Sequence, residues 1–453
     1  MEISDHLAQD RQRRAAGRGM ECGAWPACRW RWAQTGLRAL GFAGLAGFMA
    51  LAPAPQLLGA GVVAAPEALH GHGTAAARDD LRQFHAFLDA LYPQAAARGI
   101  DRATFEAAFH DLTPDPAVVR LVGQQSEFER PLSAYFTGAV SPRRIAQGRA
   151  LAQRWHRELD EIARRSGVPG SILLAAWGME SDFGRAMGDK DIIRSLATLA
   201  FIRPDRPLFR QELLDGLVIL KKGVVPRAVM KGSWAGAMGG PQFLPSTYLA
   251  HAVSYAGARS PDIWTNAPDI LASIAQFLKA SGWRRGARWG MEVIVPVSFD
   301  YALLHADFRK WAALGLRPAD GQALPRAGEA TLFFPAGAKG PAFLLGDNYW
   351  VIKAYNNSDS YALSLACLAE RIAGRSALRR PWPKGQKNWR HGEKAEIQRL
   401  LRQLGYYKDK IDGRFGPSSR DAIHAFQIAV GDAPADGVGG ADLLARLRKE
   451  ARE

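Results

Sequence analysis

The feature that most constrains the fold is a helical hydrophobic period that continues from about residue 78 to about residue 282. At its start, Leu81, Phe84 and Leu88 recur at spacings of three and four residues, which is the period of one face of an α-helix. Proline and glycine separate the helical segments, for example at residues 167–170. With 453 residues, of which 47% are hydrophobic, the chain can bury a large core. We therefore expect a mainly α-helical body.

The hydrophobic pattern changes between residues 291 and 353. Three short apolar runs, residues 293–299, 330–334 and 349–353, are typical of β-strands. The helical pattern returns at residues 360–373. The sequence therefore predicts a small β-sheet inserted in the helical body.

A basic segment follows the last of these helices. Residues 371–390 hold seven basic and no acidic residues, together with Trp382 and Trp389, which we expect to be exposed. This composition is typical of a linker, which we place at residues 374–392. A compact C-terminal module, residues 393–449, is long enough to fold alone.

The N-terminal segment, residues 1–68, is expected to be a leader. A basic stretch ending at Arg38 precedes an apolar run, residues 39–51, that is too short to span a bilayer comfortably. This pattern is typical of a secretory signal and predicts a periplasmic protein, with Met20 as an alternative start. A leader that is not cleaved would instead give a weak membrane association.

The cysteines agree with this interpretation. Cys22 and Cys28 precede the apolar run and would leave with the leader, so that Cys367 would stay alone, without a disulfide. We expect Cys367 to be a small buried residue in a helix. Because no cysteine follows the apolar run, a lipoprotein is not expected.

The chain is strongly basic, with a formal net charge of +15 and a pI near 9.9. This charge favours a polyanionic partner such as nucleic acid, anionic lipid or an acidic cell-wall polymer. The basic residues are dispersed and no groove-reading motif is present, so nucleic acid is not expected.

Glu180 is the first candidate for catalysis. It lies in the apolar segment 176–184, next to Trp177 and Phe183, and loss of hydration raises the pKa of such a carboxyl toward that of a general acid. Asp182 would point to another side of a helix and is a poor second carboxylate. A lone buried glutamate is more often an ion-paired structural residue, so both interpretations remain open on spacing alone.

A glycine-rich segment, residues 231–248, is the second candidate. Its glycines allow close approach of a ligand, Ser233 and Gln242 offer hydrogen bonds, and Trp234 and Tyr248 offer apolar walls. This mixture suits a sugar. The alternative is a tight turn between two helices.

Three motifs together resemble the lytic murein transglycosylase B family. They are Trp-Gly-Met-Glu-Ser-Asp-Phe-Gly at 177–184, the glycine-rich segment at 232–245, and Tyr-Asn-Asn-Ser-Asp-Ser-Tyr-Ala-Leu at 355–363, in the family's order. The resemblance extends over roughly residues 79–373 and implies a catalytic domain, which we place at 74–373. It implies an enzyme with a lysozyme-like helical fold, which cleaves the MurNAc–GlcNAc β-1,4 bond of peptidoglycan and leaves 1,6-anhydro-MurNAc ends.

The resemblance also implies roles for single residues. Glu180 would be the only acid and base, since the attacking group is the C6 hydroxyl of the substrate and no second carboxylate is required. No cofactor is implied. The implied substrate-binding residues are Ser233, Gln242, Tyr355, Asn356 and Tyr361.

Two positions depart from the family. Some members bind calcium in an acidic loop after the glycine-rich segment, but here residues 254–262 lack most of the oxygen ligands and include Arg259, so no metal is expected. A tyrosine found in some members is Phe277 in this chain.

The C-terminal module resembles the peptidoglycan-binding type 1 domain, on residues 397–406, 411–417 and 420–427. The resemblance implies a three-helix bundle, with turns at 412–413 and 436–437. The leading hypothesis is a monomeric lytic transglycosylase that binds and cuts peptidoglycan glycan strands. A hydrolytic muramidase on the same fold and a non-catalytic wall-binding scaffold remain as alternatives.

Overall fold

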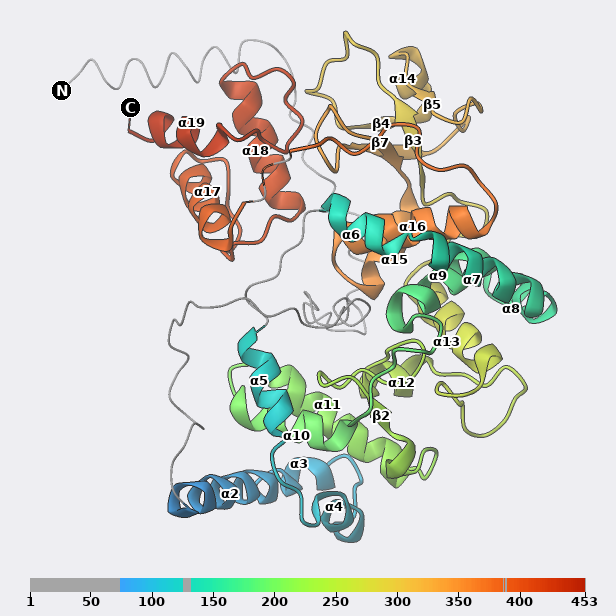
Figure 1. Cartoon of the computed structure of the whole chain (residues 1–453), viewed down its shortest axis with the longest axis vertical. Coiled ribbons are helices and arrows are strands. Elements are labelled where there is room, and N and C mark those ends of the chain that lie inside the picture. Colours follow the sequence, from blue (N-terminus) through green and yellow to red (C-terminus); the bar gives the residue numbers. More distant parts are fainter. Residues whose placement is uncertain (1–73, 125–131, 386, 388, 453) are drawn as a thin grey trace. The chain divides into compact units, whose positions relative to one another are not determined.

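The computed structural model describes residues 74–124, 132–385, 387 and 389–452. The proposed leader, residues 1–68, lies outside the described residues. Within the described part, none of the helices has the length and apolar character needed to cross a membrane. Helices dominate this part of the chain, as expected, and they are accompanied by a five-stranded sheet and a two-stranded one (Figure 1).

The body of the protein is built from helices that precede and follow the sheet. They are α2 (Thr74–Asp89), α3 (Tyr92–Ala96), α4 (Arg102–Phe109), α5 (Pro116–Gln124), α6 (Leu132–Ala139), α7 (Pro142–Arg154), α8 (His156–Ser166), α9 (Gly170–Ser181), α10 (Ile192–Ile202), α11 (Pro207–Lys221), α12 (Pro245–His251), α13 (Ala267–Ala280), α15 (Asp347–Tyr355) and α16 (Asp359–Ile372). The strands β1 (Lys190–Asp191) and β2 (Lys231–Gly232) pair antiparallel within this body.

Short polar side chains fix where several helices begin. Asp101, Ser141 and Asp191 each accept a hydrogen bond from the backbone N–H three residues on, at the starts of α4, α7 and α10. Such N-caps satisfy backbone donors that a helix cannot pair internally. Gly167, with φ of 83°, ends α8 in the left-handed conformation that glycine adopts easily.

Helix α9 is the central helix of the body. It packs against α7, α8, α13 and α16, and all its residues from Ile172 to Ser181 are buried. A helix that is apolar on all sides is expected in such a position. Its N-cap residue is Pro169, and no side chain caps the helix.

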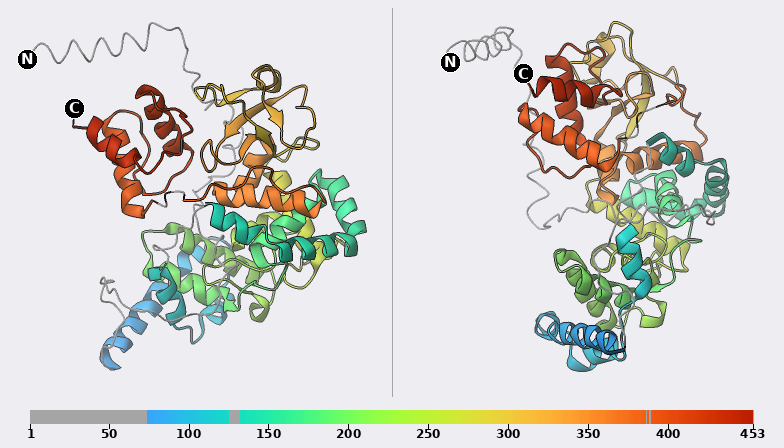
Figure 2. Two further views of the ribbon diagram at one scale, coloured as in Figure 1. Left: turned by 45° about the horizontal axis from the view of Figure 1, so that its top comes forward. Right: turned by 60° about the vertical axis from the view of Figure 1, so that its left-hand side comes forward.

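The sheet has five antiparallel strands in the order β4-β6-β7-β3-β5. They lie next to α15 at one end of the helical body (Figures 1 and 2). Leu344 pairs with Leu332 on one side and with Met291 on the other, and these side chains pack around the buried Trp311 in a core of their own. The strands are β3 (Gly290–Ile294), β4 (His305–Asp307), β5 (Arg317–Pro318), β6 (Glu329–Phe333) and β7 (Ala342–Leu345), and the short helix α14 (Phe308–Ala313) follows β4.

Two of the three predicted strands differ from the structure. Of the run 293–299, only Val293 and Ile294 belong to strand β3, and a turn follows in which the Phe299 N–H donates to the carbonyl of Pro296. Residues 349–353 belong to helix α15, in which Tyr349, Val351 and Ile352 are buried. Apolar residues on all sides of a buried helix give a short continuous run that cannot be distinguished from a buried strand by its period.

The C-terminal residues form three helices, α17 (His391–Gln403), α18 (Pro417–Ala429) and α19 (Leu443–Glu450), around a separate core. The predicted turns are present: Asp412 and Asp436 each accept a hydrogen bond from the backbone N–H two residues on. Gly413 and Gly437, which follow them, have φ of 65° and 74°.

The tryptophans of the basic segment are less exposed than expected. Trp382 packs on Phe136 with ring centroids 5.0 Å apart, and Trp389 is 7% exposed and belongs to the C-terminal core. The carboxylate of Glu292 accepts hydrogen bonds from the backbone N–H groups of Arg379 and Arg380. This segment is therefore attached to the sheet and not only solvated.

Candidate active site

Glu180 lies one residue before the end of α9 and is 2% exposed. Its Oε1 accepts a hydrogen bond from the hydroxyl of Tyr361, while Oε2 is buried without a hydrogen-bond partner among the described residues. Loss of hydration raises the pKa of this carboxyl to about 8, although the bond from Tyr361 lowers it in part. Glu180 therefore holds its proton at neutral pH.

Two tyrosines of the third motif form the surroundings of this carboxyl. The rings of Tyr355 and Tyr361 are stacked, with centroids 6.3 Å apart. Burial, followed by the charge of Glu180, raises the pKa of both hydroxyls well above the usual value. The Tyr355 hydroxyl donates to the carbonyl of Pro241 at 2.7 Å, and Phe277 packs edge-on against its ring.

The start of α16 holds Tyr361 in place. Ser358 caps the helix by accepting a hydrogen bond from the Tyr361 N–H. Asp359 forms a buried ion pair with Lys353 at 2.8 Å and accepts a hydrogen bond from Tyr349. These interactions restrict the backbone from which the Tyr361 side chain reaches Glu180.

The glycine-rich segment folds back on itself beside α9. Met238 forms β-bridges with both Gly232 and Phe243. A Cβ atom at Gly232 would lie 2.0 Å from the carbonyl oxygen of Ala237, so this turn requires glycine. The Ser181 hydroxyl donates to the carbonyl of Gly240 at 2.7 Å and joins the segment to the end of α9.

The other predicted binding residues lie around this turn and at the end of α15. The Ser233 hydroxyl oxygen accepts hydrogen bonds from the N–H groups of Ala235 and Ala237. The Gln242 side-chain nitrogen donates to the carbonyls of Met187 and Gly239, which leaves its amide oxygen as an acceptor. Asn356 is 7% exposed and is the C-cap of α15.

The structure thus brings together Glu180, Tyr361 and Tyr355, with Gln242 next to the carbonyl that Tyr355 binds. No hydrogen bond within the described residues joins Ser233 or Asn356 to Glu180.

The sequence did not point to Tyr135, on α6. The charge of Glu180 raises the pKa of its hydroxyl, after the larger effect of burial. Tyr135 lies outside all three motifs, and its short helix carries no signal of a site in the sequence.

The stretch at residues 254–262 is held by the carboxylates of Asp262 and of Asp269, which lies in α13. Asp269 accepts hydrogen bonds from the backbone N–H groups of Tyr255 and Asp262, and Asp262 accepts from Trp264 and Thr265. Within the described part of the chain, no group of three or more His, Cys, Asp or Glu residues is arranged to hold a metal ion.

Residues 83–370 match the family model described as "Transglycosylase SLT domain". The chain belongs to this family. Residues 390–447 match the model of a "Putative peptidoglycan binding domain".

Solved structures of bacterial transglycosylases are similar to this member of the family. SltB3 of Pseudomonas aeruginosa, in complex with NAG-anhNAM-pentapeptide, is 42% identical with a TM-score of 0.75, over 81% of this chain and 99% of that chain. The Escherichia coli lytic transglycosylase Slt35, in complex with bulgecin A, is 27% identical with a TM-score of 0.55, over 65% of this chain and 93% of that chain.

The membrane-bound lytic murein transglycosylase B of Escherichia coli K12 is 31% identical over 242 residues, which is 52% of this chain. The chain spans 65% of the length of this curated relative.

Proposed function

We propose that this protein is a lytic transglycosylase that cleaves the MurNAc–GlcNAc β-1,4 bond of peptidoglycan and leaves 1,6-anhydro-MurNAc ends. The observation that carries the proposal is the state of Glu180, a buried carboxyl with a pKa raised to about 8 and no ion pair among the described residues. A neutral carboxyl at pH 7 is a general acid.

One carboxyl is sufficient for this reaction. Glu180 donates its proton to the glycosidic oxygen as the bond to C1 of MurNAc breaks, and the leaving sugar departs as an alcohol. The resulting carboxylate then accepts the proton of the C6 hydroxyl, whose oxygen forms the new bond to C1. Tyr361 donates a hydrogen bond to Oε1 and stabilises the carboxylate between the two steps.

The nearby Asp182 is not available as a second catalytic group. Its carboxylate is bound by the guanidinium groups of Arg143 and Arg185. A hydrolase of this type would need a second carboxylate to activate water, so the geometry favours transglycosylation over the muramidase alternative.

The relatives support the same substrate. The name of the ligand in the SltB3 complex denotes an anhydro sugar with a pentapeptide, which corresponds to the proposed product. We assign substrate binding to Ser233, Gln242, Tyr355, Asn356 and Tyr361, the catalytic domain to residues 74–373, and wall attachment to residues 393–449, and we place the protein in the periplasm.

The test is digestion of purified sacculi followed by mass spectrometry of the muropeptides. Anhydro ends are expected from the wild-type protein, whereas reducing ends would support a muramidase and an absence of products would support a scaffold. E180Q is expected to lose cleavage by a factor of at least roughly 10³ while it still binds sacculi.

A matched control is E212Q. Glu212 is also a buried glutamate, with a pKa raised to about 7 by burial, but it accepts hydrogen bonds from Ser246 at the start of α12. E212Q should therefore retain cleavage. An E180Q variant that still clears cell walls would remove Glu180 from the mechanism.

A further inference from the structure

The turn that follows Glu180 has an unusual backbone. Asp182 and Phe183 have φ of 50° and 60°, so two consecutive residues other than glycine lie in the left-handed region. Such residues are strained and persist only where the surrounding structure holds them. Asp182 is also the C-cap of α9, the helix that carries Glu180.

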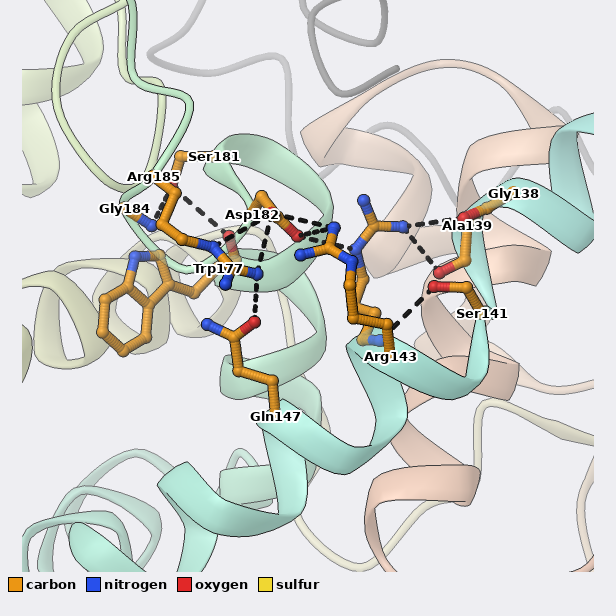
Figure 3. Close-up of polar contacts among 11 residues, drawn as sticks. Gly138, Ala139, Ser141, Arg143, Gln147, Trp177, Ser181, Asp182, Gly184 and Arg185 are labelled. Atoms are coloured by element: carbon orange, nitrogen blue, oxygen red, sulfur yellow. Dashed lines mark hydrogen bonds and ion pairs between the residues drawn. The ribbon is translucent and has the colours of Figure 1, made fainter. Parts of the chain in front are cut away.

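Three arginines surround the side chain of Asp182. Arg143 donates to both carboxylate oxygens at 3.0 and 2.9 Å, and Arg185 donates to Oδ2 at 2.9 Å. Figure 3 shows the carboxylate between these two side chains, with Gln147 accepting a further bond from Arg185. Burial alone would raise the pKa of this carboxyl, but the bond from Arg143 and the arginine charges lower it.

The third arginine, Arg144, differs from the other two because it is buried. Its side chain is 2% exposed, whereas those of Arg143 and Arg185 are 57% and 51% exposed. The Nε atom of Arg144 lies 3.5 Å from Oδ1 of Asp182, which is an ion-pair distance, but this buried Nε atom makes no hydrogen bond with the described residues. A buried guanidinium is costly unless it is paired and hydrogen-bonded.

The other end of the Arg144 guanidinium binds α6. Nη1 donates to the carbonyls of Gly138 and Ala139, at 3.1 and 2.7 Å, which lie at the C-terminal end of this helix. The same helix carries Tyr135, whose hydroxyl responds to the charge of Glu180. One side chain thus connects the turn after the acid with the helix on which Tyr135 lies.

We propose that Arg144 and Asp182 are positioning residues for Glu180, because their buried ion pair holds the turn after the acid and joins it to the end of α6. This inference rests on the proposed function of Glu180. It goes beyond that function because neither residue touches the reacting atoms and both lie outside the predicted set of binding residues.

The decisive variant is the double substitution R144M/D182N. D182N alone leaves the Arg144 charge buried without its partner, so it should lower the melting temperature clearly. In the double variant no buried charge is left unpaired, and asparagine still tolerates the left-handed backbone. The double variant should therefore regain most of the melting temperature that D182N loses.

Catalysis should not recover in parallel. We expect kcat of R144M/D182N on soluble glycan strands to stay at least roughly tenfold below wild type, because small displacements of a catalytic group are costly. KM should change less than about twofold, since no proposed binding residue is altered. R144M/D182N with a wild-type kcat, or with kcat and melting temperature recovering together, would overturn the proposal and leave a purely structural ion pair.

R144K keeps the test decisive if the double variant does not fold. Lysine preserves the charge but, as a single ammonium group, cannot bridge Asp182 and both carbonyls. We expect R144K to fold and to lose kcat severalfold; a wild-type kcat would contradict the proposal. The matched control is R149M on the same helix, because Arg149 is exposed and, among the described residues, donates only to the carbonyl of Arg371.

E180Q, assayed in parallel, separates the two hypotheses. If E180Q is inactive while R144M/D182N and R144K turn over like wild type, only the positioning role fails. If E180Q remains active, the proposed function fails and the positioning role fails with it.

Discussion

At the scale of single residues, the proposed reaction requires Glu180 to be stable in two states, protonated before the glycosidic bond breaks and ionised afterwards. Burial favours the first state, and the hydrogen bond from Tyr361 favours the second. The sequence predicts the apolar surroundings, because Trp177 and Phe183 are neighbours of Glu180 in the chain. Residue spacing could not predict the hydrogen bond from Tyr361 to Glu180, since the two residues are 181 positions apart in the chain.

Removal of that bond should move the pH dependence in a defined direction. In Y361F the ionised form of Glu180 loses a donor, so the pKa of the carboxyl rises further above about 8. The alkaline limb of kcat/KM should move to higher pH by about one unit, and kcat should fall severalfold. The measurement is a pH profile on soluble glycan strands.

Y355F is the matched control for this shift. It also removes a buried hydroxyl from the stacked pair, but that hydroxyl donates to Pro241 and not to Glu180. Its alkaline limb should coincide with that of wild type. An unshifted limb in Y361F would mean that Glu180 does not determine this limb.

The carboxyl of Glu180 should also make the free energy of unfolding depend on pH. Because its pKa is raised from 4.5 to about 8 on folding, the folded state keeps a proton that the unfolded state releases. The contribution of the Glu180 carboxyl to the free energy of unfolding is therefore fully present below about pH 4.5 and is lost as the pH rises through about 8.

E180Q, which never ionises, should match wild type near pH 4.5 and become more stable at pH 9. The difference should reach a few kcal/mol, since one pKa unit corresponds to about 1.4 kcal/mol. Denaturant unfolding of both proteins across this pH range measures it. Parallel stability curves would show that the carboxyl is not buried as described.

At the scale of elements, the helices could be predicted wherever their hydrophobic period was regular, and the errors have physical causes. Residues 349–353 form part of a helix that is buried on several sides, so no polar face marked its period. Arg144 could not be assigned to the core from the sequence. Arginine is rarely buried unless it is paired, and the sequence does not show which residue pairs with it. Such partners come from the tertiary fold.

Close packing at Gly178 gives a prediction for α9. A Cβ atom there would lie 2.7 Å from Cζ of Phe183, whose ring packs edge-on against Trp177. Although alanine favours a helix by about 1 kcal/mol over glycine, G178A should lower the free energy of unfolding by about 1 to 3 kcal/mol because it overpacks this contact. It should also lower activity, since Phe183 follows Glu180 in the same turn.

G392A is the control for the helix propensity itself. Gly392 lies in the first turn of α17 and has no atom within 4 Å of a built Cβ. This variant should be neutral or more stable by less than about 1 kcal/mol. Denaturant unfolding distinguishes the two variants; a neutral G178A would mean that Phe183 can move away without loss.

At the scale of the whole molecule, motif order in the sequence indicated a family domain followed by a wall-binding module, and family models match both segments. The two segments have separate hydrophobic cores. In the proposed function, these separate cores would allow the module to attach the enzyme to the wall without taking part in the chemistry.

Deletion of residues 386–453 tests this division of labour, because it leaves the contacts of Arg379, Arg380 and Trp382 with the catalytic domain in place. The truncated protein should bind sacculi at least tenfold more weakly, because attachment by the module raises the effective concentration of the catalytic domain at the wall. Cleavage of soluble glycan strands should stay within about twofold of wild type, since Glu180, Tyr355 and Tyr361 are retained. Asp359 loses its ion pair with Arg420 but keeps the one with Lys353. Co-sedimentation with sacculi, carried out with E180Q in both lengths, measures binding without consuming the wall.

Charge is the competing explanation, because the deleted segment contains more basic than acidic residues and the chain carries +15. Salt separates the two, since the screening length falls from about 10 Å at 0.1 M to about 3 Å at 1 M. If the module recognises the wall by contact, the full-length protein should keep its advantage at 1 M salt. If the advantage disappears at high salt, residues 386–453 act as a basic tail. Loss of cleavage of soluble strands would instead make these residues part of the catalytic unit.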